Sequence, residues 1–139
     1  MYYSSWYKDG DAFDVEPLYP GALQADDLNA LLVAGMSVSF YNNGSIVAVA
    51  GILQAWTGVA NVILQTGVGF KNCHIKIIKE IKILLAIYAD TNNIRKYYTT
   101  VEKPFIGWVK LLGFTHEYTM KEACPDSTDL FGYCLLTEG

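Results

Sequence analysis

Apolar and polar positions alternate with a period that changes several times along the chain, and each change predicts a structural element. Residues 24–35 (QADDLNALLVAG) space their leucines three and four apart between two aspartates and a glycine, which is typical of an amphipathic helix. Residues 37–66 instead predict three strands, because the apolar period becomes two and the stretches NNG and TG supply tight turns. Strands joined by such short turns form an antiparallel meander. The middle strand, residues 45–56, is apolar enough to be covered on both faces.

The second half of the chain predicts a parallel crossover. Residues 74–90 (HIKIIKEIKILLAIYAD) repeat apolar side chains at three- and four-residue steps, with lysines mostly on the opposite side. This pattern predicts a long helix that ends between residues 90 and 93. Residues 94–102 follow as a strand, so the helix joins two strands that should be parallel, with a right-handed connection.

The two ends of the chain are patterned differently. A proline suits the first turn of a short helix over residues 105–112, and strands over residues 115–123 and 129–136 close the chain. Residues 11–21 carry two prolines and read as irregular. YYSSWY, residues 2–7, is open to two interpretations, a disordered end or an aromatic segment that docks onto a partner.

Composition indicates one compact globular domain, residues 1–139. Apolar residues make up 52% of the chain and the mean hydropathy is slightly positive, which excludes an intrinsically disordered chain. Only 17% of the residues are charged, below the usual quarter, and there are 10 tyrosines. A surface with so little charge favours a protein partner or a homo-oligomer.

Charge and cysteine content exclude several classes of function. A net charge of −4 supplies no basic surface for nucleic acid, so we expect no nucleic-acid partner. No apolar run reaches the length of a membrane span and the first residues do not resemble a signal peptide, so we expect a cytoplasmic protein. Cys73, Cys124 and Cys134 are an odd set without metal-ligand spacing, which favours a reducing compartment and no metal site.

The order of these elements and two local motifs resemble the GNAT acyltransferase family. YNNGSIVAVAGI, residues 41–52, is similar to the family's second and third strands, which are joined by an Asn/Asp-Gly hairpin turn. FIGWVKLLGF, residues 105–114, is similar to the short helix after the fifth strand, which ends in Leu-Gly-Phe. The resemblance spans residues 37–136. It implies an α/β (α+β) fold: a mixed, mostly antiparallel sheet of about six or seven strands, a central βαβ unit and helices on both faces.

A narrower resemblance concerns the long helix and its flanks. Residues 62–88, followed by WVKLLGF, are similar to the small GNAT-like proteins of short-tailed phages, which are encoded among virion and internal-core genes. This resemblance implies a phage-encoded protein in the host cytoplasm, or one associated with the virion.

The family resemblance also implies a cofactor, acetyl-CoA, and a loop that holds its pyrophosphate before the long helix. In the family this loop reads Gln/Arg-x-x-Gly-x-Gly/Ala, whereas here one residue is missing between Gln65 and the first glycine. Lys71 would meet a phosphate. The alternative is that Gly67 and Gly69 only terminate a strand. The implied cofactor-binding residues are Leu64, Gln65, Thr66, Gly67, Val68, Gly69, Phe70 and Lys71.

The catalytic groups of the family are not all present. The tyrosine that protonates the leaving thiolate in many members falls on Val109, and an asparagine common at the start of that segment falls on Glu102. Cys73, at a helix N-terminus, would have a lowered pKa, but no His-Asp pair accompanies it. We expect Glu102 and Tyr98 to act as catalytic residues, from a set of candidate bases that no spacing distinguishes: Tyr97, Tyr98, Glu102, Glu117, His74 and His116.

Two functions remain open from the sequence. The first is a phage-encoded GNAT-like acyltransferase that moves an acetyl group from acetyl-CoA to an amine on a protein or small molecule. The second is a catalytically degenerate GNAT-like protein that acts in virion assembly through protein-protein contacts. The missing tyrosine and the shortened loop favour the second, whereas the two glycines of the loop favour the first.

Overall fold

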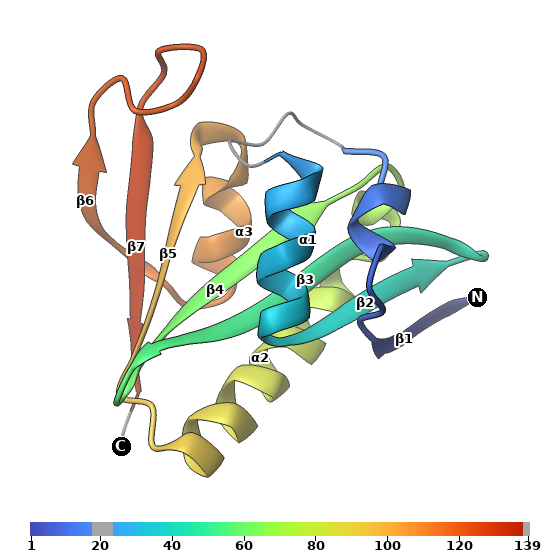
Figure 1. Cartoon of the computed structure of the whole chain (residues 1–139), viewed down its shortest axis with the longest axis horizontal. Helices are drawn as coiled ribbons and strands as arrows, with labels where there is room; N and C mark the ends of the chain where they lie inside the picture. Colours follow the sequence, from blue (N-terminus) through green and yellow to red (C-terminus); the bar gives the residue numbers. More distant parts are fainter. Residues whose placement is uncertain (18–23, 138–139) are drawn as a thin grey trace. The chain divides into compact units, whose positions relative to one another are not determined.

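The computed structural model describes residues 1–17 and 24–137, so residues 18–21 of the segment expected to be irregular lie outside it. Within the described residues seven strands form one mixed sheet in the order β1-β2-β3-β4-β5-β7-β6 (Figure 1). The strands are β1 (Tyr2–Trp6), β2 (Met36–Asn42), β3 (Ser45–Trp56), β4 (Val59–Thr66), β5 (Lys96–Glu102), β6 (Thr115–Met120) and β7 (Leu130–Leu136). The helices are α1 (Ala25–Ala34), α2 (His74–Asn92) and α3 (Ile106–Leu111), with 3-10 turns η1 (Asp11–Asp14), η2 (Phe70–Asn72) and η3 (Lys103–Phe105).

The chain divides into two compact units. The first unit is Met1–Leu53 with Val62–Ile77, and the second is Gln54–Asn61 with Ile78–Gly139. Strands β3 and β4 and helix α2 each contribute residues to both units. The single domain expected from chain length stays a prediction.

The first unit confirms the hairpin predicted from the sequence. Strands β2 and β3 pair antiparallel, and Asn43 and Gly44 between them have φ of 52° and 83°. Positive φ at both central residues is the requirement of the tight turn that Asn-Gly favours. Six successive residues of β3, Val47–Ile52, are buried, which confirms that its middle is covered on both faces.

Helix α1 closes the core of the first unit. Leu28 and Leu32 lie one turn apart and pack with Val49 of β3, with Ala12 of η1 and with Val15 just after η1. The opposite side of the helix is exposed to solvent. This is the amphipathic helix that the sequence predicts, and it begins and ends within one residue of the expected bounds.

A buried polar network ties the N-terminal segment to this core. The Asp11 carboxylate accepts hydrogen bonds from the Lys8 backbone N–H at 2.9 Å and from the Ser39 hydroxyl at 2.7 Å. The Tyr7 hydroxyl donates to the side-chain oxygen of Asn29 on α1. Burial raises the pKa of Tyr7 above its ordinary value. The polar groups of this segment are therefore satisfied by α1 and β2.

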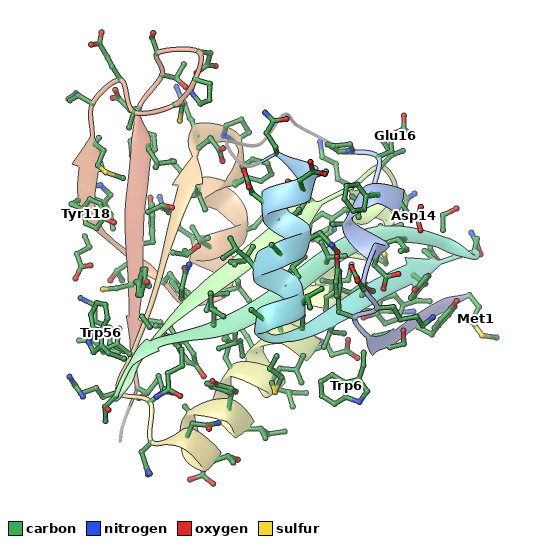
Figure 2. All side chains as sticks on the ribbon, viewed as in Figure 1. Met1, Trp6, Asp14, Glu16, Trp56 and Tyr118 are labelled. Atoms are coloured by element: carbon green, nitrogen blue, oxygen red, sulfur yellow. The ribbon has the colours of Figure 1, made fainter. Side chains whose placement is uncertain are left out.

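The N-terminal segment is a strand, so its interpretation as a disordered end is wrong. Strand β1 pairs antiparallel with β2, and the Tyr3 ring stacks on that of Tyr41 with centroids 4.7 Å apart. Its partner lies far along the chain, so local periodicity carries no sign of it. Trp6 is 65% exposed and projects from β1 (Figure 2). The docking interpretation stays a prediction.

The second unit confirms the parallel strand pair. Residues Val59–Asn61 of β4 pair parallel with Lys96–Tyr98 of β5, after the long helix α2. The helix ends at Asn92, within the predicted range. Strand β7 then lies between β5 and β6 and pairs antiparallel with both.

The short helix stops as its sequence predicts. Gly113 has φ 95°, and its N–H donates to the Lys110 carbonyl at 3.0 Å. The Phe114 N–H donates to the Val109 carbonyl at 3.1 Å, and the Phe114 side chain is buried. The first residues differ from the prediction: the proline lies in the 3-10 turn η3, and the α-helix starts at Ile106.

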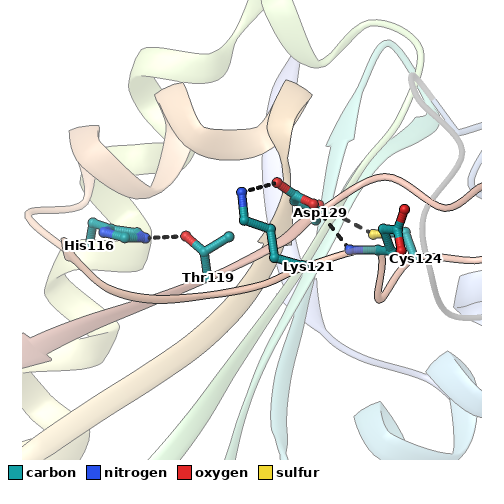
Figure 3. Close-up of polar contacts among 6 residues, drawn as sticks. His116, Thr119, Lys121, Cys124 and Asp129 are labelled. Atoms are coloured by element: carbon teal, nitrogen blue, oxygen red, sulfur yellow. Dashed lines mark hydrogen bonds and ion pairs between the residues drawn. The ribbon is translucent and has the colours of Figure 1, made fainter.

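Strand β6 ends earlier than predicted because a hydrogen-bonded turn follows it. The Asp129 carboxylate pairs with Lys121 at 3.6 Å and accepts the Glu122 backbone N–H at 3.1 Å. The Cys124 thiol donates to the Asp129 carbonyl at 3.5 Å (Figure 3). Glu122 has φ 53°, which a strand does not tolerate. The segment KEA therefore belongs to the turn.

Candidate functional site

The predicted cofactor-binding residues lie at the end of β4 (Leu64–Thr66) and in residues 67–71 between β4 and α2, all in the first unit. Strand β4 ends at Thr66, Gly67 forms an isolated bridge with Pro17, and Gly69 begins the 3-10 turn that leads into α2. Gly69 has φ 92°, the left-handed conformation that glycine adopts without strain. The loop thus has the strand, glycine turn and helix start that the family resemblance implies.

Two amides of the loop already donate hydrogen bonds within the chain. The Gly67 N–H bonds to the Val47 carbonyl at 2.7 Å, and the Val68 N–H bonds to the Glu16 carbonyl at 2.8 Å. A cradle for pyrophosphate uses backbone N–H groups that point to the ligand. These two amides point to β3 and to the segment after η1 instead.

The turn after Gly69 uses further amides. The Phe70 N–H donates to the Gly67 carbonyl at 3.0 Å, and the Asn72 N–H donates to the Gly69 carbonyl at 3.1 Å. These bonds close the 3-10 turn η2, which brings the chain to the start of α2. Phe70 is fully buried beneath this turn, and Lys71 is exposed.

Gly67 also has a packing role. A Cβ added at Gly67 would lie 2.9 Å from Val15 Cγ1 and 3.1 Å from the carbonyl oxygens of Glu16 and Val47. The segment after η1 therefore approaches the loop too closely for a side chain. Together with the left-handed Gly69, this gives both glycines a local structural reason, in line with the alternative that they shape the end of a strand.

One polar atom beside the loop lacks a partner. The Thr66 hydroxyl is completely buried and makes no hydrogen bond within residues 1–17 and 24–137. The neighbouring Gln65 side-chain amide donates to the Thr66 carbonyl at 2.9 Å, and the Leu64 side chain is half-buried. A buried hydroxyl without a partner is costly, so it marks a position that a water or ligand atom would satisfy.

The start of α2 corrects the prediction for Cys73. Burial raises the pKa of the Cys73 thiol, and the nearby charge of Lys76 only partly opposes this shift. Desolvation disfavours the thiolate more than one exposed lysine favours it. His74 Nδ1 lies 2.9 Å from the Lys71 carbonyl oxygen, and since a carbonyl only accepts, this nitrogen donates. Cys73 and His74 are therefore not arranged as a nucleophile and its general base.

Tyr98 and Glu102, the expected catalytic residues, lie on β5 in the second unit, whereas Leu64–Lys71 belong to the first. The Tyr98 ring stacks on Trp56 with centroids 6.5 Å apart. Glu102 ends β5 opposite Leu130 of β7 and is half-buried. Both side chains therefore keep some contact with solvent.

The other candidate bases are engaged. The Tyr97 hydroxyl donates to the Leu85 carbonyl at 2.6 Å, and burial raises the pKa of Tyr97 well above its ordinary value. Lys96 forms an ion pair with Glu117, and its hydrogen bond to the Glu117 carboxylate lowers the pKa of that group. A lowered pKa makes a carboxylate a weaker base.

His116 is the last of the candidate bases, and Val109 is the position at which many family members carry a tyrosine. The His116 Nε2 lies 2.9 Å from the Thr119 hydroxyl, and its ring contacts that of Tyr133 with centroids 5.5 Å apart (Figure 3 shows the first contact). Val109 is buried in α3.

Within the described residues no three His, Cys, Asp or Glu side chains are placed to hold a metal ion. In the same part of the chain, no helix has the length and apolar character that a membrane span needs.

The loop amides and the Thr66 hydroxyl are the features that sequence reasoning missed. The sequence shows Gly67 and Gly69, but the carbonyls that accept the Gly67 and Val68 amide protons belong to Val47 and Glu16, far earlier in the chain. A threonine on a buried strand face gives no local sign that its hydroxyl lacks a partner.

Comparisons with known proteins identify the fold. No family model matches the sequence, and no curated protein matches it significantly. Among solved structures, a GNAT family acetyltransferase from Elizabethkingia anophelis with acetyl-CoA bound is similar with a TM-score of 0.71 at 13% identity, covering 98% of each chain. An N-acetyltransferase from Staphylococcus aureus Mu50 is similar with a TM-score of 0.68 at 16% identity, covering 98% of this chain and 97% of that one.

A third similar structure extends over nearly the same length. IAA acetyltransferase from Bacillus cereus has a TM-score of 0.71 at 8% identity and covers 99% of this chain and 100% of that one. Identities this low establish the fold alone. The predicted GNAT-like fold, with its mixed and mostly antiparallel sheet, is thereby confirmed.

Proposed function

We propose that this protein is a GNAT-like acyltransferase that transfers an acetyl group from acetyl-CoA to an amine of a protein or a small molecule. The observation that carries the proposal is the loop between β4 and α2: a strand end with an unpartnered Thr66 hydroxyl, the left-handed Gly69, and an exposed Lys71 before the helix. The resemblance of this segment to the family's pyrophosphate loop supports the proposal. The acetyl-CoA-bound structure from Elizabethkingia anophelis shares the fold, which supports the choice of cofactor.

The loop fits acetyl-CoA in part. Lys71 and the N-terminus of α2 supply positive charge for phosphates, and Gly69 allows close approach of the backbone. The Gly67 and Val68 amides do not fit, because Val47 and Glu16 already accept their protons. In this proposal binding rests on Lys71 and the start of α2, together with the end of β4 and the residues after it, Leu64–Phe70.

The chain's own contribution to the reaction would be orientation and proton transfer. Acetyl-CoA would supply an activated acetyl thioester, which an amine attacks as the C–S bond breaks. Glu102 and Tyr98 are the proposed acceptor and donor of protons on β5. Holding the two reactants in place contributes to the rate even where proton transfer is weak.

Calorimetric titration with acetyl-CoA tests the binding step. We expect a micromolar dissociation constant, and Lys71→Glu should weaken it about tenfold or more because the phosphates lose a positive neighbour. Lys8→Glu, an exposed lysine of the same unit, is the matched control and should leave binding unchanged. Absence of heat and of a thermal shift at millimolar acetyl-CoA would remove the acyltransferase proposal.

A kinetic test addresses the residues on β5. Glu102→Gln and Tyr98→Phe should each lower kcat by about 10²-fold or more if they move protons in the reaction. Variants with wild-type kcat would show that proximity alone drives the transfer.

A second function is favoured by the engaged amides of Gly67 and Val68 and by the buried Val109, where many family members carry a tyrosine. In this proposal the chain is a GNAT-like binding protein of a phage, acting in virion assembly in the host cytoplasm. It predicts co-purification with assembled particles and no acetyl-CoA binding. A protein that is absent from particles and turns over acetyl-CoA would exclude it.

A further inference from the structure

The outer side of α2 in the second unit is unusually apolar for a surface helix. Ile83 is 59% exposed and Ile87, one turn later, is 57% exposed. Ala86 between them is also exposed. The opposite side of the helix already buries Ile81 and Leu85, so these isoleucines are not needed for the core of the unit. We call the exposed side, Lys79, Lys82, Ile83, Ala86, Ile87 and Asp90, the outer α2 face.

Charges of opposite sign flank the isoleucines. Lys79 and Lys82 lie at the N-terminal end of the outer α2 face, and Asp90 lies at its C-terminal end. Helical geometry places Lys79 and Asp90 about 16 Å apart along the axis and within about 20° of each other around it. Lys96 pairs with Glu117 and Lys121 pairs with Asp129, and these four residues lie outside α2.

A cleft adjoins the outer α2 face. Its volume is about 610 Å³, and Ala86 and Asp90 belong both to its wall and to the face. Leu136 of β7 lines it from the sheet side and is 72% exposed. The face therefore combines an apolar ridge with a hollow beside it.

We propose that the outer α2 face is the interface of a homodimer, with the two α2 helices antiparallel about a two-fold axis. With the two-fold axis crossing the helix at the level of Leu84 and Leu85, Lys79 of each copy faces Asp90 of the other. Ile83 of each copy then lies opposite Ala86 of the other, at the wall of the cleft. A face with a basic end and an acidic end is complementary to itself only in the antiparallel arrangement. Antiparallel helix dipoles add to this preference.

A second copy matches these features better than other occupants do. An anionic membrane would favour a basic face throughout, whereas Asp90 is acidic. The chain as a whole has only 17% charged residues, which agrees with part of its surface being covered. The inference does not depend on the proposed acyltransferase function.

Sedimentation velocity over a concentration series tests the apolar part of the interface. The wild type should form a dimer, and Ile83→Glu with Ile87→Glu should raise its dissociation constant about 100-fold or more. Leu111→Glu, an exposed apolar residue on α3, is the matched control and should leave the constant unchanged. A wild type that stays monomeric to millimolar concentration, or a dimer that survives the double variant, would overturn the proposal.

Charge reversal tests the antiparallel arrangement. Lys79→Asp and Asp90→Lys alone should each weaken the dimer about tenfold at low salt, because like charges then face each other. Combining both changes in one chain should restore the wild-type constant to within about threefold. Additive weakening in the combined variant would overturn the antiparallel pairing. Binding to phosphatidylserine vesicles by a protein that never dimerises would assign the face to a membrane and overturn the proposal as well.

Discussion

The Gly67 N–H donates a hydrogen bond to the Val47 carbonyl at 2.7 Å, which ties the loop after β4 to the neighbouring strand. The next amide, that of Val68, donates to Glu16, so the loop is held from two sides. A loop held in this way is preorganised, but it offers a phosphate fewer donors than an open glycine loop would. Because these two amides are already used within the chain, our proposal assigns phosphate binding to Lys71 and the start of α2.

Gly67→Ala should destabilise the protein by about 1–3 kcal/mol, because the added Cβ would press against a side chain and two carbonyl oxygens. Urea unfolding of the variant measures the loss of free energy. Gly107→Ala is the matched control, since a Cβ there meets open space in α3. That change should be neutral or stabilise by up to about 1 kcal/mol through helix propensity. Equal effects at the two positions would contradict the close packing at Gly67.

Ser39→Ala should cost about 1.5–3 kcal/mol, because the buried Asp11 carboxylate would lose one of its hydrogen-bond donors. Ser5 lies directly opposite Ser39 in the sheet, and its hydroxyl donates only to the adjacent Trp6 carbonyl at 3.4 Å. Ser5→Ala is therefore a control of the same chemistry, with an expected loss within about 0.5 kcal/mol. Chemical denaturation of both variants decides the question, and a Ser39 variant as stable as the Ser5 variant would show that Asp11 does not need this donor.

Tyr97→Phe should reduce the stability at neutral pH by about 1 kcal/mol, through the lost hydrogen bond to Leu85. The raised pKa of Tyr97 means that the folded state holds its proton more tightly than the unfolded chain does. The resulting stabilisation is complete below the unfolded pKa of about 10 and is lost as the pH rises above it. The free energy of unfolding, measured by chemical denaturation between pH 8 and 11, should therefore decrease more steeply with pH for the wild type than for Tyr97→Phe. Parallel slopes would mean that the phenol is not protected from ionisation.

The Cys73 thiol should react slowly with iodoacetamide at pH 8. Burial both shields the sulfur and raises its pKa, so less thiolate is present. Peptide mapping over time should find Cys73 alkylated about tenfold or more slowly than the half-buried Cys134. In urea the two rates should converge. A faster reaction at Cys73 in the folded protein would restore the activated thiol that its position at a helix start first suggested.

Several elements follow from the sequence because their causes are local. Asn43 and Gly44 adopt positive φ in a turn that their residue types favour, and Gly113 ends α3 for the same reason. The period of α2 predicts which isoleucines are buried, since 3.6 residues per turn depends on nothing outside the helix. The order of the strands in the sheet could be expected only because residues 37–136 resemble the GNAT family.

Other features were decided by tertiary structure, since their causes lie in residues far apart in the chain. Strand β1 exists because β2 offers it a partner, and the Cys73 pKa rises because the fold buries the sulfur. Whether the Gly67 amide is available to a ligand depends on Val47, a residue of another strand. Periodicity and residue type report a side chain's own preferences, whereas burial and hydrogen-bond partners are set only when distant segments meet. The sequence by itself thus determined the elements and the fold family they resemble, and the tertiary structure decided which polar groups of the candidate site remain without partners.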